Sequence, residues 1–180
     1  MKKGIKSLKI TVALAFLVAL SIILGKYLAI RGGDIMRFSL ENMPIIFAGM
    51  TFGPIAGLLV GAIADIIGCI MVGYTINPLV TVGAAAIGFI SGIIPALLKG
   101  KKLDSRFTTA ITVILSHLVG SVVIKTLGLA AYYDMPLGIL LLWRILNYLI
   151  VGLLDGAVIY VLMKNKGVEL QLAKLKEAEK

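Results

Sequence analysis

Long apolar stretches, separated by short groups of glycine, proline and charged residues, dominate the pattern of this 180-residue chain. They lie near residues 8–30, 38–52, 54–73, 78–98, 107–129 and 137–163. A helix needs about 20 residues to cross the ~30 Å apolar core of a bilayer, and the short second stretch has to tilt or begin within the preceding loop. The stretches are continuous rather than alternating, which argues against β-barrel spans. The pattern therefore predicts an all-α integral membrane protein with six transmembrane helices.

The composition excludes an ordinary soluble globule. Apolar residues make up 59% of the chain and charged residues 15%, with a mean hydropathy of +1.03. In water, a protein of this size would leave much of that apolar surface exposed. We expect residues 1–163 to form one six-helix transmembrane domain and residues 164–180 to form a charged cytoplasmic tail. Of two interpretations of the tail, a surface amphipathic helix and a frayed end, we expect the frayed end.

Basic residues give the orientation in the membrane. Of the 18 Lys and Arg residues, 13 fall in the N-terminal segment, the connection near 99–106 and the tail, and the positive-inside rule assigns these segments to the cytoplasm. Both termini are then cytoplasmic, and the connections near 31–37, 74–77 and 130–136 face outward. The net charge of +9 reflects this topology rather than nucleic-acid binding. The first outward connection is either a lid or a plain connector.

Ionisable side chains inside the apolar stretches are the candidate functional residues, because a charge in a membrane is costly. On the last two stretches, polar and small residues recur at helical spacing: His117, Ser121, Lys125 and Gly128, then Arg144, Tyr148, Gly152 and Asp155. The topology puts three cations and one carboxylate in the outer half of the bundle: Lys26, Lys125, Arg144 and Asp65. Their expected neighbours are Tyr74, Asn77, Tyr132, Tyr133 and Trp143. Such a set suits an anionic organic molecule with an aromatic or hydrogen-bonding ring.

Each of these residues also has a purely structural explanation. Lys26 can extend its amine to lipid headgroups, and the aromatic residues can form an interfacial belt. Asp65 can serve only to neutralise a buried cation, Arg144 or Lys125. We expect His117 to be a hydrogen-bonded core residue rather than a metal ligand, because no second ligand has suitable spacing. We expect Asp155 to be structural.

Several kinds of chemistry have no signature in the chain. It has no phosphate-binding loop that ends in Lys-Ser or Lys-Thr, so energy from ATP has to come through another chain. It has no zinc-protease or serine-hydrolase motif, and Cys69 is its one cysteine. We therefore expect a protein that is not an enzyme, with no catalytic residues, no metal site and no cofactor of its own.

One block of sequence resembles a known family. The segment from Arg37 to Gly68, which contains Asn42-Met43-Pro44, Gly53-Pro54 and Ala64-Asp65, is similar to the substrate-binding S-components of energy-coupling factor (ECF) transporters, particularly their folate family. The resemblance continues through Asn77-Pro78, the fourth stretch, Lys125-Thr126 and Arg144, and it covers residues 10–163.

The resemblance implies a membrane-embedded subunit that captures a vitamin from outside. Its implied partners are a transmembrane coupling protein and two ATPase subunits, which hydrolyse the ATP. Similar proteins dock the coupling protein through an Ala-x-x-x-Ala arrangement on the first helix, which Ala15 and Ala19 match. The loop at 31–37 would close over the ligand, and Lys26 matches a basic residue at the outer end of the first helix. Where the folate family often has Asn-Thr, this chain has Lys125-Thr126, which adds a cation.

From the resemblance we expect high-affinity binding and uptake of folate across a bacterial plasma membrane. The expected substrate-binding residues are Lys26, Asp65, Tyr74, Asn77, Lys125 and Arg144. The cations would meet the glutamate carboxylates, Asp65 or Asn77 the pteridine N–H groups, and Tyr74 the ring. Within the family, the alternative is another anionic vitamin such as pantothenate. Outside it, the alternatives are a membrane-embedded enzyme, which needs a convergent catalytic set, and a structural subunit with internally paired charges and no cavity.

Overall fold

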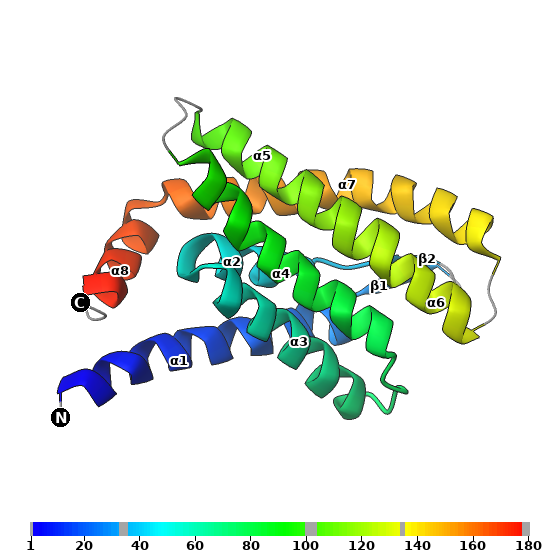
Figure 1. The fold of residues 1–180 in the computed structure, drawn as a ribbon, viewed down its shortest axis with the longest axis horizontal. Coiled ribbons are helices and arrows are strands. Elements are labelled where there is room, and N and C mark those ends of the chain that lie inside the picture. Colours follow the sequence, from blue (N-terminus) through cyan, green and yellow to red (C-terminus); the bar gives the residue numbers. More distant parts are fainter. Residues whose placement is uncertain (1, 33–35, 100–103, 134–135, 178–180) are drawn as a thin grey trace.

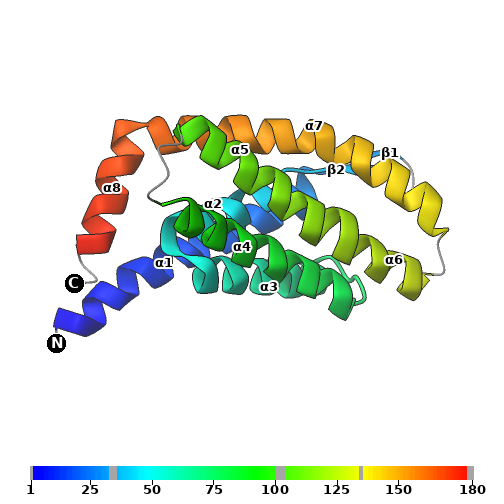
Figure 2. The same cartoon turned by 45° about the horizontal axis from the view of Figure 1, so that its top comes forward.

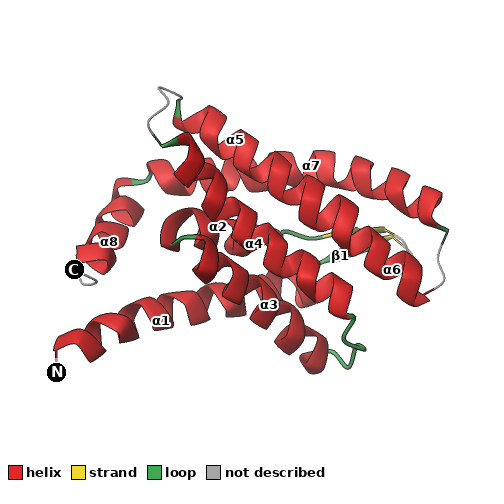
Figure 3. Ribbon diagram, in the orientation of Figure 1, coloured by secondary structure: helices red, strands yellow, loops and turns green. Residues whose placement is uncertain are grey.

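The computed structural model describes residues 2–32, 36–99, 104–133 and 136–177, and helices make up nearly all of this part of the chain (Figure 1, Figure 3). In chain order the elements are α1 (Lys2–Ile22), η1 (Ile23–Tyr27), β1 (Ile30–Gly32), β2 (Met36–Phe38), α2 (Asn42–Phe52), α3 (Pro54–Met71), α4 (Pro78–Leu98), α5 (Ser105–Ser116), η2 (His117–Ile124), α6 (Lys125–Tyr133), α7 (Leu137–Lys164) and α8 (Lys166–Glu177). The π-helical segment η1 prolongs α1, and η2 joins α5 to α6. Each of these groups therefore forms one long helix.

Within the described ranges, five helices are long and apolar enough to cross a membrane: Leu8–Tyr27, Pro54–Met71, Pro78–Leu98, Ser105–Tyr132 and Leu137–Lys164. They confirm the predicted multi-pass helical class. The second apolar stretch departs from the prediction, because its helix α2 has 11 residues and is about 16 Å long. That length is roughly half of a ~30 Å apolar core. The helix is short because strand β2 and a turn occupy residues 36–41, which a full-length span would need.

Helix α2 lies inside the bundle, and nine of its residues are buried. Helices α2, α3 and α4 pack against one another with their backbones in contact, through small residues. A Cβ at Gly57 or at Gly88 would overlap backbone atoms of the other glycine, and one at Gly61 would overlap the carbonyl of Ala84. Gly53, with a φ of 95°, forms the sharp turn between α2 and α3. The glycines therefore hold these three helices together, which is how small residues associate helices in a membrane.

The described chain begins and ends at the same end of the bundle (Figure 1). The start of α1, the end of α4, the start of α5 and helix α8 all lie there, and the α3–α4 connection lies at the opposite end. Figure 2 shows α7 running along α5 and α6 on one side, with α3 and α4 on the other. The described parts of the three basic segments thus lie at one end of the molecule.

The first connection contains a short β-hairpin that the sequence analysis did not predict. Strands β1 and β2 are antiparallel, with Ile30 opposite Phe38 and Gly32 opposite Met36. The Nδ2 group of Asn147 on α7 donates to the carbonyl of Arg37, at 2.7 Å, and so ties the hairpin to α7. Residues 33–35, at the centre of the loop assigned as a lid or a connector, lie outside the described residues.

The expectation of a frayed tail is wrong for residues 166–177, which form helix α8. Asn165 provides the reason at the start of this helix, because its Oδ1 accepts hydrogen bonds from the backbone N–H groups of Gly167, at 2.8 Å, and Val168, at 3.3 Å. Val168 and Leu172 then pack against the hydrophobic core. A helix cap and an apolar face together stabilise the tail.

Candidate ligand-binding site

A cavity of about 910 Å³ lies among η1, the β-hairpin, α3, α4, α6 and α7. This volume is within the range of pockets that hold small organic ligands. All six residues expected to bind substrate line its wall: Lys26, Asp65, Tyr74, Asn77, Lys125 and Arg144. The wall also includes Arg37, Glu41, Cys69, Trp143, Asn147 and Tyr148. The fold therefore brings the expected residues together from η1, α3, α6, α7 and the α3–α4 connection.

Lys26 reaches the cavity from the end of the first long helix. Its Nζ lies 3.7 Å from the Sγ of Cys69 and 5.9 Å from the centre of the Tyr74 ring. Gly68 makes this approach possible, because a Cβ at that position would overlap the Lys26 side chain. Both contacts of the amine are with uncharged groups. Lys26 thus brings a positive charge to the cavity wall rather than to the lipid headgroups.

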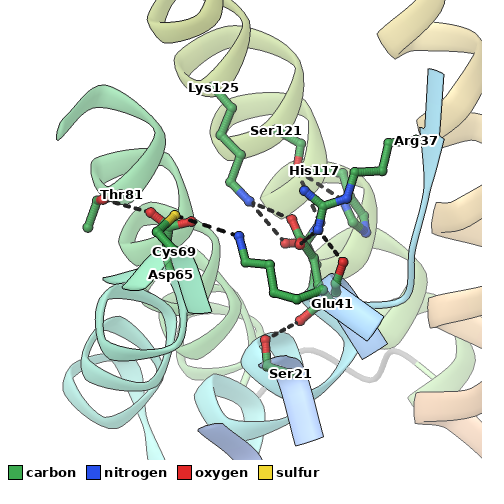
Figure 4. Close-up of polar contacts among 12 residues, drawn as sticks. Ser21, Arg37, Glu41, Asp65, Cys69, Thr81, His117, Ser121 and Lys125 are labelled. Atoms are coloured by element: carbon green, nitrogen blue, oxygen red, sulfur yellow. Dashed lines mark hydrogen bonds and ion pairs between the residues drawn. The ribbon is translucent and has the colours of Figure 1, made fainter. Parts of the chain in front are cut away.

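Glu41, immediately before α2, joins two further cations (Figure 4). Its Oε1 lies 3.3 Å from Nζ of Lys125, and its Oε2 lies 3.1 Å from Nη2 of Arg37. Arg37 also donates to the carbonyl of Gly25, and the hydroxyl of Ser21 donates to the carbonyl of Glu41 at 2.7 Å. Since Lys125 is only 4% exposed, the carboxylate offsets a charge that would be costly to bury alone.

No role was predicted for Glu41, although two features of the sequence pointed to an ion pair. Arg37 and Glu41 are four residues apart, and Glu41 is the only acidic residue between positions 35 and 64. The acidic residue considered as the partner of Lys125 or Arg144 was Asp65. In the structure Asp65 instead accepts a hydrogen bond from the Thr81 hydroxyl, with Oδ2 at 2.7 Å. Its carboxylate keeps further acceptor capacity for a ligand.

Asn77 lines the cavity, but its side chain also has a structural task. Its Oδ1 caps α4 by accepting from the N–H groups of Leu79, at 3.1 Å, and Val80, at 3.3 Å. Its Nδ2 donates to the carbonyl of Gly128 at 2.8 Å. Both ends of the amide thus hold α4 against α6, so Asp65 is the more available acceptor of the two.

One face of α7 meets η2 in a polar seam, which we define as Arg144, Tyr148 and Asp155 with Ser121 and His117. Nη1 of Arg144 donates to the carbonyl of Ser121 at 2.7 Å, and its guanidinium carbon lies 5.9 Å from the Tyr148 ring centre. The rings of Tyr148 and His117 are 4.9 Å apart at 30°. Nε2 of His117 lies 2.9 Å from Oδ2 of Asp155. The two polar helix faces found in the sequence therefore pack against each other.

Hydrogen bonds connect this seam to the charged cluster of Glu41, Arg37 and Lys125 (Figure 4). Lys125 donates to Oδ1 of Asn42, Nδ2 of Asn42 donates to Ser121, and Oγ of Ser121 lies near Nδ1 of His117, each at 3.4 Å. His117 is buried and hydrogen-bonded on both nitrogens, which confirms its assignment to the core. Asp155 is fully buried outside the cavity wall, which agrees with a structural role.

Among the described residues, the charged groups on the cavity wall are four cations, Lys26, Arg37, Lys125 and Arg144, and two carboxylates, Glu41 and Asp65. The wall thus carries two positive charges in excess. Two of the cations share Glu41, whereas Lys26 and Arg144 contact uncharged groups. A structural subunit was expected to pair Lys125 and Arg144 internally and to have no accessible cavity. Lys125 does pair with Glu41, but Arg144 contacts a backbone carbonyl and a cavity is present, so the structure matches that alternative only in part.

A bundle of membrane-length apolar helices around a charged internal cavity defines this chain as a multi-pass membrane protein with a site for a small ligand. The model of one family, described as the ECF-type riboflavin transporter S component, matches residues 5–169. The chain belongs to this family of ECF transporter S-components, which confirms the resemblance seen in residues 37–68. Because S-components are transport subunits, the family also confirms that the chain is not an enzyme.

Two curated relatives are similar to this chain over part of their length. An uncharacterised MG313 homologue from Mycoplasma pneumoniae is 26% identical over 130 residues, which cover 72% of this chain and 45% of the relative. The folate transporter FolT of Clostridium novyi is 32% identical over 63 residues, which cover 35% of this chain and 36% of the relative. The chain thus spans less than half the length of these relatives.

Solved structures share the fold. FolT bound with folic acid matches with a TM-score of 0.67 and 21% identity, over 83% of this chain and 89% of that one. An S-component for biotin from an ECF-type ABC transporter matches with a TM-score of 0.65 and 23% identity, over 91% and 95%. The S component of a bacterial ECF transporter matches with a TM-score of 0.67 and 19% identity, over 88% and 95%. At these identities the similarity concerns the fold alone.

Proposed function

We propose that this chain is the substrate-capture subunit of an ECF transporter and that its ligand is folate. The observation that carries the proposal is the charge of the cavity wall, which has two positive charges in excess and two cations, Lys26 and Arg144, in contact with uncharged groups. Folate carries two carboxylates on its glutamate, so its charge complements the wall. Charge-assisted hydrogen bonds to these carboxylates are the strongest that such a site can form.

The remaining lining residues suit the pteridine ring. Asp65 offers a carboxylate to the amino and N–H groups of the ring, and Tyr74 and Trp143 offer aromatic faces. In this arrangement Lys125 acts mainly through Glu41, which it holds in place, and Asn77 acts mainly as the cap of α4. The similarity to a Clostridium novyi folate transporter supports this assignment.

The proposal includes partners and a place in the cell. Uptake would require a transmembrane coupling protein, docked on the face of α1 that carries Ala15 and Ala19, and two ATPase subunits that hydrolyse ATP. This chain would bind no cofactor of its own. In the proposed topology the end of the bundle that holds both termini faces the cytoplasm of a bacterium, and α2 completes a sixth crossing together with the residues before it.

Other vitamins make different demands on the same cavity. Pantothenate has one carboxylate and no aromatic ring, so it would leave one cation and the aromatic wall unused. Riboflavin, for which the matching family is described, is uncharged and would leave both Lys26 and Arg144 without an anionic partner. Binding of folate is therefore the assignment that uses most of the wall.

A titration of the purified protein in detergent tests the assignment. We expect saturable binding of folate and of a reduced folate, with weaker binding of pantothenate and riboflavin. Replacement of Lys26 or Arg144 by Ala should lower folate affinity roughly tenfold or more, which corresponds to one hydrogen bond to a charged group. The matched control is Lys166→Ala on α8, away from the cavity. No saturable response to any folate, or unchanged affinity in both variants, would refute the ligand assignment.

A further inference from the structure

The seam between α7 and η2 contains two residues that the proposed ligand chemistry does not use. His117 and Asp155 lie outside the cavity wall, and their side chains are buried. Their contact, 2.9 Å between Nε2 and Oδ2, is the last step of a series that begins at the cavity with Arg144. An ion pair or hydrogen bond buried in this way needs a strict geometry, because neither partner can turn to water.

The hydrogen bonds around His117 fix the orientation of its ring. A carboxylate only accepts, so Nε2 of His117 carries the proton toward Asp155, and Nδ1 is then able to accept from the hydroxyl of Ser121, 3.4 Å away. At Gly152, α7 lies close to the ring, and a Cβ there would be in ordinary van der Waals contact with Cδ2 of His117, at 3.7 Å. The His117 ring is therefore held at both nitrogens.

The fixed ring in turn supports Arg144. The Tyr148 ring packs on the His117 ring, with 4.9 Å between their centres. The guanidinium carbon of Arg144 lies over the Tyr148 ring, 5.9 Å from its centre. The second support of Arg144 is the carbonyl of Ser121, on the same turn of η2 as His117. Both supports of the cation thus depend on the segment that His117 anchors.

Apart from the hydrogen bond from Asn147 to the carbonyl of Arg37, helix α7 has few other means of holding this position. Of its 28 residues only Leu140, Val151, Asp155 and Ile159 are buried, and the neighbours of Arg144 in sequence, Trp143 and Ile145, are exposed. Ordinary core packing is therefore thin along the part of α7 that faces the cavity. The polar seam, rather than core packing, therefore holds this part of α7.

We propose that the buried His117–Asp155 pair is a positioning device for Arg144 and that, through Arg144, it sets the preference of the site for ligands that carry the glutamate carboxylates. The inference rests on the proposed function for its choice of ligand. The pair acts without touching the ligand. It fixes the η2 turn and the Tyr148 ring relative to each other, so that the guanidinium of Arg144 faces the cavity in the position that binds the ligand.

A double-mutant cycle tests this coupling. The measured quantity is the ratio of affinities for folate and for pteroate, which lacks the glutamate and its two carboxylates. Arg144→Gln should lower this ratio roughly tenfold, the loss expected for a charge-assisted hydrogen bond. His117→Leu combined with Asp155→Leu should lower it by a similar factor in the native background and leave it unchanged in the Arg144→Gln background, because residues that act as a unit are not additive. Equal effects in the two backgrounds would overturn the proposal.

Two further variants guard against a simple loss of folding. Tyr148→Leu removes the ring that links His117 to Arg144 and leaves the buried pair intact, so it should lower the same ratio, and Tyr148→Phe should recover most of the loss. Thr112→Val is the matched control, because Thr112 is also buried and its hydroxyl donates to the carbonyl of Thr108 on its own helix, away from the seam. A change in the ratio with Thr112→Val, or none with Tyr148→Leu, would count against the coupling.

A readout without ligand separates this inference from the folate assignment. Trp143 is the only tryptophan of the chain and adjoins Arg144 on the cavity wall, so its fluorescence reports the position of α7. Replacement of the His117–Asp155 pair should shift its emission and increase its quenching by acrylamide, whereas Thr112→Val should not. If the wild-type protein fails to bind folate, the ligand assignment fails, and the tryptophan signal still decides the positioning role. Unchanged fluorescence would overturn that role.

Discussion

Glu41 shows how one residue can organise a charged cavity in an apolar bundle. It pairs with Arg37, four residues before it, and with Lys125 from α6, so two segments distant in sequence meet at one carboxylate. Lys125 is buried, and Glu41 supplies the negative charge that its amine contacts. The carboxylate therefore matters to folding as well as to the electrostatics of the site.

Replacement of Glu41 by Gln should reduce the apparent free energy of unfolding in detergent by about 1–3 kcal/mol, because it leaves a buried cation without its counter-charge. Adding Lys125→Met should restore part of this loss, since the second change removes the unpaired charge. Thermal unfolding of the two single variants and the double variant measures the effect. Glu169→Gln on the exposed side of α8 is the matched control. Additive losses in the double variant would show that the pair has no role in stability.

At the residue scale, the sequence was sufficient to predict the charged residues that line the cavity but not which of them form ion pairs. Lys26, Lys125, Arg144 and Asp65 were found because charges are rare in apolar stretches, and helical spacing gave their approximate depth. The partner of Lys125 was missed, because Glu41 lies before a short helix whose position depends on the hairpin. Which carboxylate meets which cation is decided by tertiary packing.

At the element scale, the contact between α3 and α4 depends on the absence of side chains. Gly57 and Gly88 bring the two backbones together, and a Cβ on either one would overlap the other. Gly156 on α7 is a useful contrast, because a Cβ there meets nothing within 4 Å. Position 88 thus has no room for a side chain, whereas position 156 has room for one.

Gly88→Ala should lower the apparent free energy of unfolding by about 1–3 kcal/mol, as expected when a tightly packed contact is overfilled. Gly156→Ala should have no cost or raise it by up to about 1 kcal/mol, since alanine is the better helix former. Comparison of the two melting temperatures in the same detergent measures the difference. A Gly88→Ala protein as stable as the Gly156→Ala protein would contradict the packing.

The elements themselves were predicted with uneven success. The long helices follow from the apolar stretches of the sequence, which are long enough to be recognised as membrane spans. The hairpin was missed. The second apolar stretch was recognised as short but was expected to cross the membrane, and a helical tail was considered but not expected. Each of these features depends on a contact across the fold or on a local cap. The Asn165 cap was visible in the sequence, but the apolar face of α8 gains its partner only when the tail reaches the core.

At the scale of the whole molecule, one long apolar surface of α1 is exposed in the part of the chain that the structure describes. Leu8, Val12 and Phe16 are each at least 60% exposed, and Ala15 and Ala19 are exposed beside them. In the proposed transporter, this surface is the docking site for the coupling protein. Small residues let a partner helix approach closely.

Replacement of Ala15 and Ala19 by Leu should abolish co-purification with the coupling protein and the ATPases while leaving folate affinity in detergent unchanged, because neither residue lines the cavity. The expected reason is steric, since added side chains keep the partner helix away. Ala157→Leu, an exposed alanine on α7, is the matched control and should assemble normally. Normal assembly of the Ala15 and Ala19 variant would place the docking surface elsewhere.

The unequal packing of the two sides of the cavity bears on how such a protein diverges over evolution. On one side, glycine contacts leave the facing surfaces of α2, α3 and α4 almost no tolerance for new side chains. On the other, α7 exposes most of its residues and contributes Trp143, Arg144 and Tyr148 to the wall. Substitutions can therefore accumulate on α7 and redesign the ligand preference while the glycine-packed scaffold stays unchanged. One scaffold with a replaceable wall accounts for a single fold that is shared by transport proteins described for riboflavin, biotin and folate.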